Sequence, residues 1–517
     1  MGIQVKRILP FVLALVFGMP AWGQSVDSNG AKQLSDDLSR YIGRKALDSG
    51  ILKVSVDGDA YRIAFDFDAL LKMKPSKDAL TFNLAPFAVL VKPRGDGSWS
   101  VSSDLVPNAF FDVAGPQGVR FSVSGAAFSG AYDSELAAFT SGASSMAGMK
   151  VISRDPEEPM DLSIGAGTST LSASKAASGG VDFAIKQTIA DFVETATVDA
   201  GGTGPKVPVT TKAPKVSVEL TGNGVRTKAL LDLLGFAVAN QDEASLKANQ
   251  AQLKSLLTSA LPLWERLEES YHFEGLSFAS SMGNFELADL SATTGIDGIS
   301  SNGRIDYRIK ATGLTVPQHL LPGWSVPLLP TDVELSFGGA NIDLDSMARE
   351  AIEAFDLNKD PPLSDEFGEA LVADFMAKNP KIVLRHSTVK NGDVEVAMEG
   401  EMTFPGKKPD TAMIVDVAGY EKIVQAVQAA AKTDPQAAQV FPAALAIKGF
   451  AKTLPDGRLE WAIDVKGDGS IIVNGAMLKP ADAVQDDRGI IDPNDATVQD
   501  DDSGENDNGG AGAKLQP

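Results

Sequence analysis

The sequence predicts an α+β protein made mainly of curved antiparallel β-sheets, with helices packed on one face. Apolar and polar residues alternate through much of the chain, which is the pattern of strands that bury one face. Helical spacing is confined to a few segments between these stretches. The chain has 517 residues, 44% of them hydrophobic, so it can bury a large core although it contains no cysteine.

The N-terminal segment has the layout of a secretory signal. A basic start that includes Lys6 precedes an apolar run ending at Met19, and small residues stand just ahead of Gln24. The run is shorter than the roughly 20 residues that span a bilayer. We therefore expect residues 1–23 to be a cleaved signal peptide, so that no transmembrane segment remains. An uncleaved anchor is the alternative.

The composition excludes several kinds of site and partner and favours one cellular compartment. The absence of cysteine excludes thiol nucleophiles, thiolate metal sites and a lipoprotein anchor. Together with the export signal, it favours the periplasm of a Gram-negative bacterium, where disulfides are permitted but not required. The net charge of −22 opposes binding to nucleic acid, whose phosphates need a basic surface.

A β-rich N-terminal region is expected over residues 24–198. It opens with a predicted helix over residues 28–50, in which Leu34 and Leu38 share a face and Gly50 suits the C-terminal end. Strands then follow wherever apolar residues alternate. The clearest such stretches are residues 61–67, 80–84, 121–123 and 181–185.

Gly, Pro and Thr dominate residues 199–215, and we expect a linker or a long loop there. An α+β region is predicted beyond it, over residues 216–480. It carries a helical insertion at residues 227–271, which Pro262 is expected to kink or split.

The second half of this region alternates between strands and short helices. Alternation predicts strands around residues 305–309 and 333–337. Helices are expected at about residues 345–355, 364–378, 420–432 and 435–448. Ser364 and Asp434 stand where N-caps are needed.

Asn391-Gly392 is the strongest short hairpin signal in the chain. A two-residue loop would place Val389 opposite Val394 and would set Leu384 opposite Glu399. This mismatch of apolar and charged residues predicts a bulge or a longer loop.

The stretch 457–480 carries an apolar stripe that includes Leu459, Trp461 and Ile463. We expect the stripe to cover the protein's own core, with Trp461 buried and its indole N–H paired. The acidic residues 481–517 have little apolar content, and this composition predicts a disordered tail.

We identify no catalytic, cofactor-binding or metal-binding residues. His272, His319 and His386 are too far apart in sequence for a helical metal pair, and His386 shares the parity of a predicted core-facing strand. Nucleophile-elbow, P-loop and dinucleotide-binding motifs do not occur. The sequence therefore predicts a protein that is not an enzyme.

One acidic stretch resembles the start of a calcium loop, because Asp356, Asn358 and Asp360 alternate. Pro361 stands where that loop needs glycine, and Phe367 where it needs glutamate. A solvated turn is the better interpretation.

The apolar, proline-rich segment 319–330 has two readings. It is either a loop packed on the domain, or the lip of a groove or a docking strip, and the packed loop is favoured.

The export segment, the first helix, the many amphipathic strands and the closing "DGRLEWAIDVKGDGSIIVNG" stretch together resemble a group of Gram-negative, especially alphaproteobacterial, cell-envelope proteins of unknown function. This group is loosely similar to the AsmA-like and YdgA-like families. The resemblance covers most of residues 24–480 in pattern and carries no site residues over. Those relatives usually keep a membrane anchor, whereas we expect a cleaved signal followed by a mature chain with an acidic tail here, and this departs from the pattern of the group.

Two functions are consistent with these features. One is a non-enzymatic protein that binds lipid-like or other apolar ligands in the periplasm, on a sheet face that stays partly open. The other is a structural or protein-interaction protein of the cell envelope with a closed core. The oligomeric state is not indicated.

Overall fold

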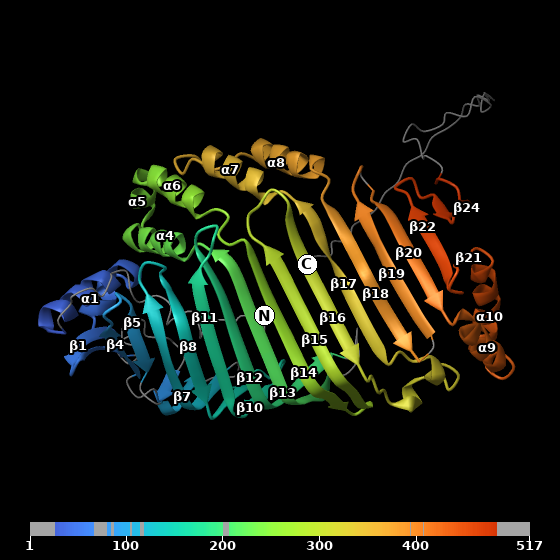
Figure 1. Cartoon of the computed structure of the whole chain (residues 1–517), viewed down its shortest axis with the longest axis horizontal. Helices are drawn as coiled ribbons and strands as arrows, with labels where there is room; N and C mark the ends of the chain where they lie inside the picture. The colour runs from blue at the N-terminus through green and yellow to red at the C-terminus, as the bar shows by residue number, and fades with distance from the viewer. Residues whose placement is uncertain are drawn as a thin grey trace, which may run out of the picture.

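The computed structural model describes residues 26–66, 80–83, 87–103, 106–113, 118–199, 206–392, 394–406 and 408–482. The strands in these residues join into one sheet of 24 strands, and their neighbours pair antiparallel (Figure 1). The prediction of a mainly antiparallel, β-rich α+β fold is confirmed. The expected signal peptide lies outside the described residues, and so does the tail beyond Asp482.

Two long strands near the N-terminus connect different parts of the sheet. The first half of β7 (Val119–Asp133) pairs with β6 and β9, and its second half pairs with β5 and β8. In the same way, β12 (Val181–Asp199) pairs with β11 and then with β10. The other strands of this part are β1 (Leu52–Asp57), β2 (Ala60–Phe65), β3 (Leu80–Asn83), β4 (Phe87–Pro93), β5 (Trp99–Ser103), β6 (Val106–Val113), β8 (Ala138–Met146), β9 (Gly148–Ser153), β10 (Met160–Ile164) and β11 (Gly167–Lys175).

From β12 onward the order of strands in space follows their order along the chain. Each strand hydrogen-bonds to the next, except that β20 pairs with β22 and the short β21 adds to β22. These strands are β13 (Lys206–Val225), β14 (Arg266–Ser280), β15 (Gly283–Asp297), β16 (Gly303–Thr312), β17 (Asp332–Ile342), β18 (Lys381–Asn391), β19 (Val394–Thr403), β20 (Asp410–Ala418), β21 (Lys452–Thr453), β22 (Leu459–Val465), β23 (Ile471–Val473) and β24 (Ala476–Lys479).

The linker or long loop expected at residues 199–215 differs from the structure. Residues 206–215 belong to β13, which pairs with β12 as far as Asp199 opposite Lys206. Pro214 is accommodated because the regular pairing with β14 is interrupted there, between Lys212 and Lys215. The alternating valines at 207 and 209 are typical of a strand, whereas the Gly, Pro and Thr content of the stretch is typical of a loop and led to the wrong prediction.

Five helices lie at one end of the strands (Figure 1). They are α4 (Thr227–Ala239), α5 (Glu243–Ala248) and α6 (Gln250–Ala260) between β13 and β14, and α7 (Leu344–Ala354) and α8 (Asp365–Ala377) between β17 and β18. The helical insertion expected at residues 227–271 therefore ends earlier, and Tyr271 lies in a strand. The expected layer of helices on one sheet face is not confirmed, because these five are grouped at strand ends.

Helices also stand at the two ends of the sheet. These are α1 (Ser28–Ile42) and α2 (Arg44–Asp48) beside β1, and α9 (Tyr420–Ala430) and α10 (Pro435–Lys448) beside β22. The predicted N-caps are confirmed, since Ser364 accepts a hydrogen bond from Phe367 N and Asp434 accepts from Gln436 N. Among the described residues, no helix is both long enough and apolar enough to cross a bilayer.

The predicted hairpin at Asn391-Gly392 is present, with Asn391 opposite Val394. The expected pairing of Val389 with Val394 is wrong, because Val389 lies opposite Val396. A bulge between Leu384 and Ser387 places Leu384 opposite Gly400, and a bulge is one of the two alternatives that the mismatch predicted.

Candidate functional site

A single row of side chains runs across the sheet from one end to the other. Directly opposed residues of an antiparallel pair project from the same face, so following the partners from strand to strand traces the row. With strands about 4.8 Å apart, the row is roughly 80 Å long. Its members are Val56, Tyr61, Val91, Val101, Gly130, Gly142, Leu171, Ile185, Leu220, Glu269, Thr294, Tyr307, Phe337, Leu384, Gly400, Met413, Ile463 and Val473.

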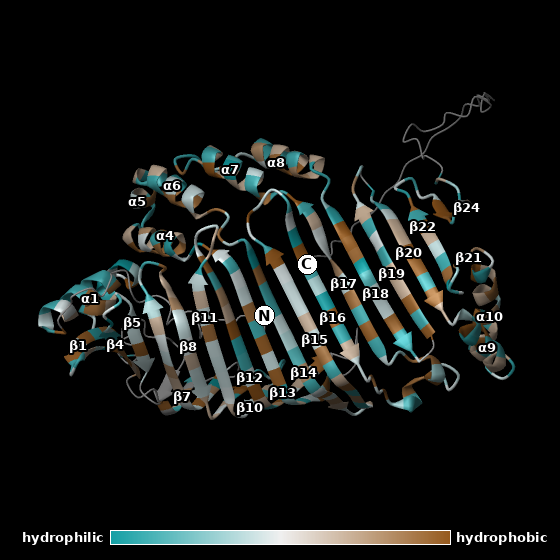
Figure 2. Cartoon of the chain, in the orientation of Figure 1, coloured by the Kyte–Doolittle hydropathy of each residue, from teal (hydrophilic) through white to brown (hydrophobic). Residues whose placement is uncertain are grey.

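We call the face that carries this row the apolar face. The neighbouring rows on it are also apolar, for example Val216, Phe273, Leu290, Ala311 and Val333. The opposite face carries ion pairs between strands, such as Lys186 with Glu219. Figure 2 shows the resulting alternation of hydrophobic and hydrophilic residues along β12 to β20.

The N-terminal end of the apolar face is covered by α1. Leu34 and Leu38 of this helix join one buried cluster with Tyr61, Val91 and Val101 of the row. The face is closed here, and this cluster is the largest core of the described residues.

The C-terminal end is covered by α9 and α10. Trp461 is only 6% exposed, and its indole Nε1–H donates to the carbonyl of Ile447 at 2.9 Å. The ring of Tyr420 lies 5.5 Å from it, centroid to centroid, and the Tyr420 hydroxyl donates to Ala444 O. The prediction that Trp461 is buried with a paired N–H is confirmed.

The sheet bends along a line across its strands, which we call the crease. Strand residues at this line have positive φ, among them Asp191 in β12 and Gly275 in β14. Phe273 and Leu276 are three residues apart and should face opposite sides, yet both belong to one apolar cluster. Gly275, at φ 63°, resets the alternation, because glycine adopts this conformation without strain.

Along the crease the apolar face folds onto itself. Ala213, Val216 and Leu276 are buried there, with Phe192 and Leu287 packed against them. Among the described residues, the strands themselves thus form the cluster that protects this part of the apolar face.

Between these covered parts, the middle of the apolar face is open. Six large side chains on β14 to β18 are 37% to 50% exposed, so no described segment covers them. We call them the open patch: Tyr271, Ile296, Tyr307, Ile309, Phe337 and Ile382. The rings of Tyr307 and Phe337 stack at 5.4 Å between centroids and form its centre.

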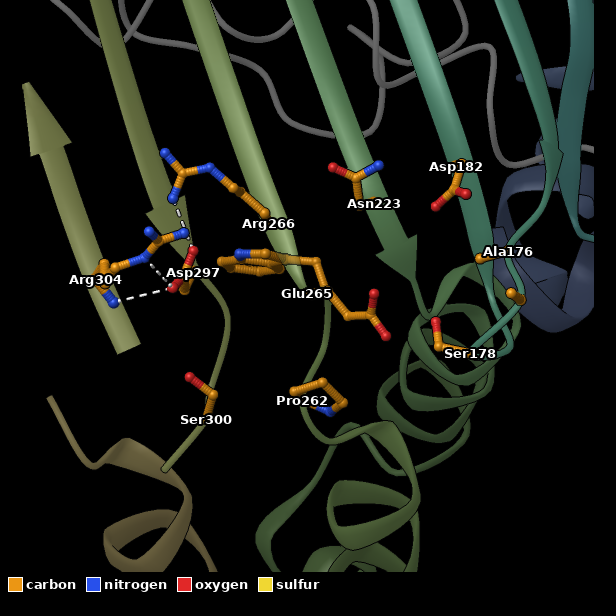
Figure 3. A pocket seen from close by; sticks show the side chains of 12 residues that line it. Ala176, Ser178, Asp182, Asn223, Pro262, Glu265, Arg266, Asp297, Ser300 and Arg304 are labelled. Atoms are coloured by element: carbon orange, nitrogen blue, oxygen red, sulfur yellow. Dashed lines mark hydrogen bonds and ion pairs between the residues drawn. The ribbon is translucent and has the colours of Figure 1, made fainter. Parts of the chain in front are cut away.

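A separate hollow of about 600 Å³ lies on the polar face, beside the helix-bearing strand ends (Figure 3). Arg266 pairs there with Asp297 at 2.8 Å, and Arg304 lies 3.4 Å from the same carboxylate. Asp182 accepts a hydrogen bond from Gly224 N. These groups hold strand ends together, so we assign no chemistry to the hollow.

The three histidines lie apart. His272 Nε2 is 3.0 Å from Asp289, and His386 Nδ1 is 3.9 Å from Glu399. The expectation that His386 lies near the core is wrong, because its side chain is exposed. The bulge between Leu384 and Ser387 changes the alternation at this point.

The acidic stretch that resembles a calcium loop is a turn. Asp356 Oδ1 accepts hydrogen bonds from the backbone and side-chain nitrogens of Asn358, both at 3.0 Å. The backbone hydrogen bond from Asn358 is the main cause that lowers the pKa of Asp356. This matches the predicted solvated turn.

The proline-rich segment 319–330 is a loop held against the end of β18. Asn391 Nδ2 donates to the carbonyls of Pro327 and Leu329. Short 3-10 turns, Gln318–Leu320 and Val326–Leu328, shape the loop. These contacts agree with the favoured prediction of a packed loop.

Comparisons of the chain with protein-family models, with curated proteins and with solved structures found no match.

Sequence reasoning identified the amphipathic strands but not the open patch. The apolar parity of residues 305–309 and 333–337 was visible, whereas the position of the helices relative to them was not. The signal that could have found the patch is the lack of an α-helical segment between β14 and β17.

Proposed function

We propose that this chain is an exported, non-enzymatic protein of the bacterial cell envelope that binds lipid-like or other apolar molecules in the periplasm. The observation that carries the proposal is the open patch, which lies in the middle of a face covered at both ends.

Energetics supports a ligand at this position. Each Å² of apolar surface left in water costs about 25 cal/mol relative to burial, and contiguous apolar patches commonly mark binding surfaces. Six large side chains on five adjacent strands form such a surface.

The dimensions also favour an acyl chain. Five strands about 4.8 Å apart extend roughly 20 Å across the patch. A bilayer core of about 30 Å contains two acyl chains end to end, so one chain spans about 15 Å. A single chain lying across the strands would therefore extend over about four of the five strands of the patch.

Two measurements test the proposal. Mass spectrometry of an organic extract of the purified protein should detect an apolar ligand. The neutral fluorescent probe N-phenyl-1-naphthylamine should bind the delipidated protein, and Ile309→Gln should weaken this binding several-fold. Arg308→Gln is the matched control, because Arg308 is the preceding residue and projects from the polar face.

The alternative is a structural or protein-interaction protein of the envelope with a closed core. It requires the open patch to be inaccessible in solution. It predicts that no lipid copurifies and that the probe gives the same weak signal with the Ile309 and Arg308 variants.

A further inference from the structure

Glu269 interrupts the apolar face at one point. Four adjacent rows of this face extend from β12 to β23 between the crease and the helix-bearing strand ends. Among the described residues of these rows that lie opposite a residue of a neighbouring strand, one is charged, Glu269 in β14. Leu220 lies opposite it on β13 and Thr294 opposite it on β15.

The carboxylate of Glu269 has a hydrogen-bond donor beside it but no cationic partner among the described residues. Its Oε1 accepts a hydrogen bond from the Tyr271 hydroxyl at 2.6 Å, and no cationic side chain among the described residues pairs with it. Glu268, the preceding residue on the polar face, instead lies 3.3 Å from Arg266. A half-buried carboxylate without a cation is costly, so its presence in an apolar face calls for a partner.

The position of Glu269 matches the geometry of a bound amphiphile. The carboxylate stands at the border of the open patch, beside Tyr271 and two strands from Tyr307 in the same row. A ligand with its chain over Tyr307 and Phe337 would place its end at Glu269. A carboxylate accepts hydrogen bonds and favours a cationic donor, since such bonds are roughly twice as strong as neutral ones.

We propose that the ligand of the open patch is an amphiphile with a protonated amine at one end, held by Glu269, with its alkyl chain lying across β15 to β18. This inference rests on the proposed function and adds the chemical class of the ligand. Thr294 offers a second polar contact for the same end group.

Competition between matched ligands tests this inference. Dodecylamine, dodecanol and dodecanoate, each below its critical micelle concentration, would displace N-phenyl-1-naphthylamine from the delipidated protein at neutral pH. We expect dodecylamine to compete at about tenfold lower concentration than dodecanol, because a charge-assisted hydrogen bond contributes on this scale. Dodecanoate should compete least, because its charge repels Glu269.

Two variants locate the preference. Glu269→Gln should remove the tenfold advantage of the amine, so that dodecylamine and dodecanol compete at similar concentrations. Thr294→Lys should do the same by supplying a cation directly opposite Glu269, so the test does not depend on one substitution. Glu219→Gln is the matched control: it makes the same charge change on the polar face of β13 and should preserve the advantage.

The outcomes separate the two proposals. Probe binding with equal competition by amine and alcohol, or an amine advantage that survives both variants, would overturn the role of Glu269 while leaving the apolar site intact. Absence of probe binding to the wild-type protein would overturn both. Circular dichroism and the melting temperature establish that each variant is folded.

Discussion

The C-terminal end and the middle of the apolar face have the same strand pattern but different surroundings. Trp461 and Phe337 both project from this face, on β22 and β17. Trp461 is 6% exposed under α9 and α10, whereas Phe337 is 39% exposed. The difference arises from the connections: two helices follow β20 and fold onto the face, while those after β17 stay at the strand ends. A common alternation therefore produces a core at one end and an exposed apolar surface in the middle.

Trp461→Ala should give the largest loss of stability. Removing the indole leaves a cavity under α10 and removes its hydrogen bond to the Ile447 carbonyl, at a cost of about 3–5 kcal/mol. Urea denaturation followed by circular dichroism measures it. A loss below about 1 kcal/mol would mean that the C-terminal end is as open as the middle.

Leu276→Ala tests the part of the apolar face that the crease protects. Leu276 is 3% exposed and packs where the sheet folds onto itself, so we expect a loss of about 2–5 kcal/mol in the same assay. Stability close to wild type would show that the crease opens in solution.

Phe337→Ala should cost about 1 kcal/mol, because much of its ring already contacts water. Binding of N-phenyl-1-naphthylamine should fall several-fold, since the variant removes half of the stacked pair at the centre of the patch. A loss as large as that of Trp461→Ala, with unchanged probe binding, would contradict the contrast between the two regions.

The stability that ion pairs on the polar side of the sheet contribute should fall in acid, unlike the stability contributed by the apolar face. Hydrogen bonds from Arg154 and, to a smaller extent, from Arg120 lower the pKa of the Asp112 carboxyl below the usual 3.8. A carboxylate with a lowered pKa in the folded state stabilises it above pH 3.8, and this contribution disappears as the pH falls through the folded pKa. Asp112→Asn should therefore be less stable than wild type at pH 7, with a smaller difference near pH 2. An equal difference at both pH values would argue against the ion pairs.

Deleting residues 483–517 should have the smallest effect. Their composition cannot bury enough apolar surface to offset the entropy of ordering. Calorimetry should show a change in melting temperature of less than about 4 °C. A larger drop would show that the tail packs on the folded part, for instance over the open patch.

The parts that could be predicted from the sequence are those governed by local rules. Alternation predicted the strands, and the side chains of Ser364 and Asp434 predicted two helix starts. The misfit of Leu384 with Glu399 predicted a bulge or a longer loop, and the structure has the bulge although its register differs from the expected one. Each depends on residues close together in the chain.

The remainder depends on how distant segments lie. Glu269 is one of many acidic residues in the sequence. Its position among uncharged residues of the apolar face is visible only from the strand registers, which place Leu220 and Thr294 beside it. The crease was missed because Gly275 reads as an ordinary strand glycine until its opposed strands are known.

The order of the strands has a kinetic consequence. From β12 to β20 each strand pairs with the strand that precedes it in the chain, so no pairing has to wait for a segment synthesised much later. Sheets of this kind have low contact order for their size and can grow by adding one strand at a time to a formed edge. As the chain emerges N-terminus first, the part closed by α1 can act as the template, and α9 and α10 cover the last strands only when synthesis is nearly complete.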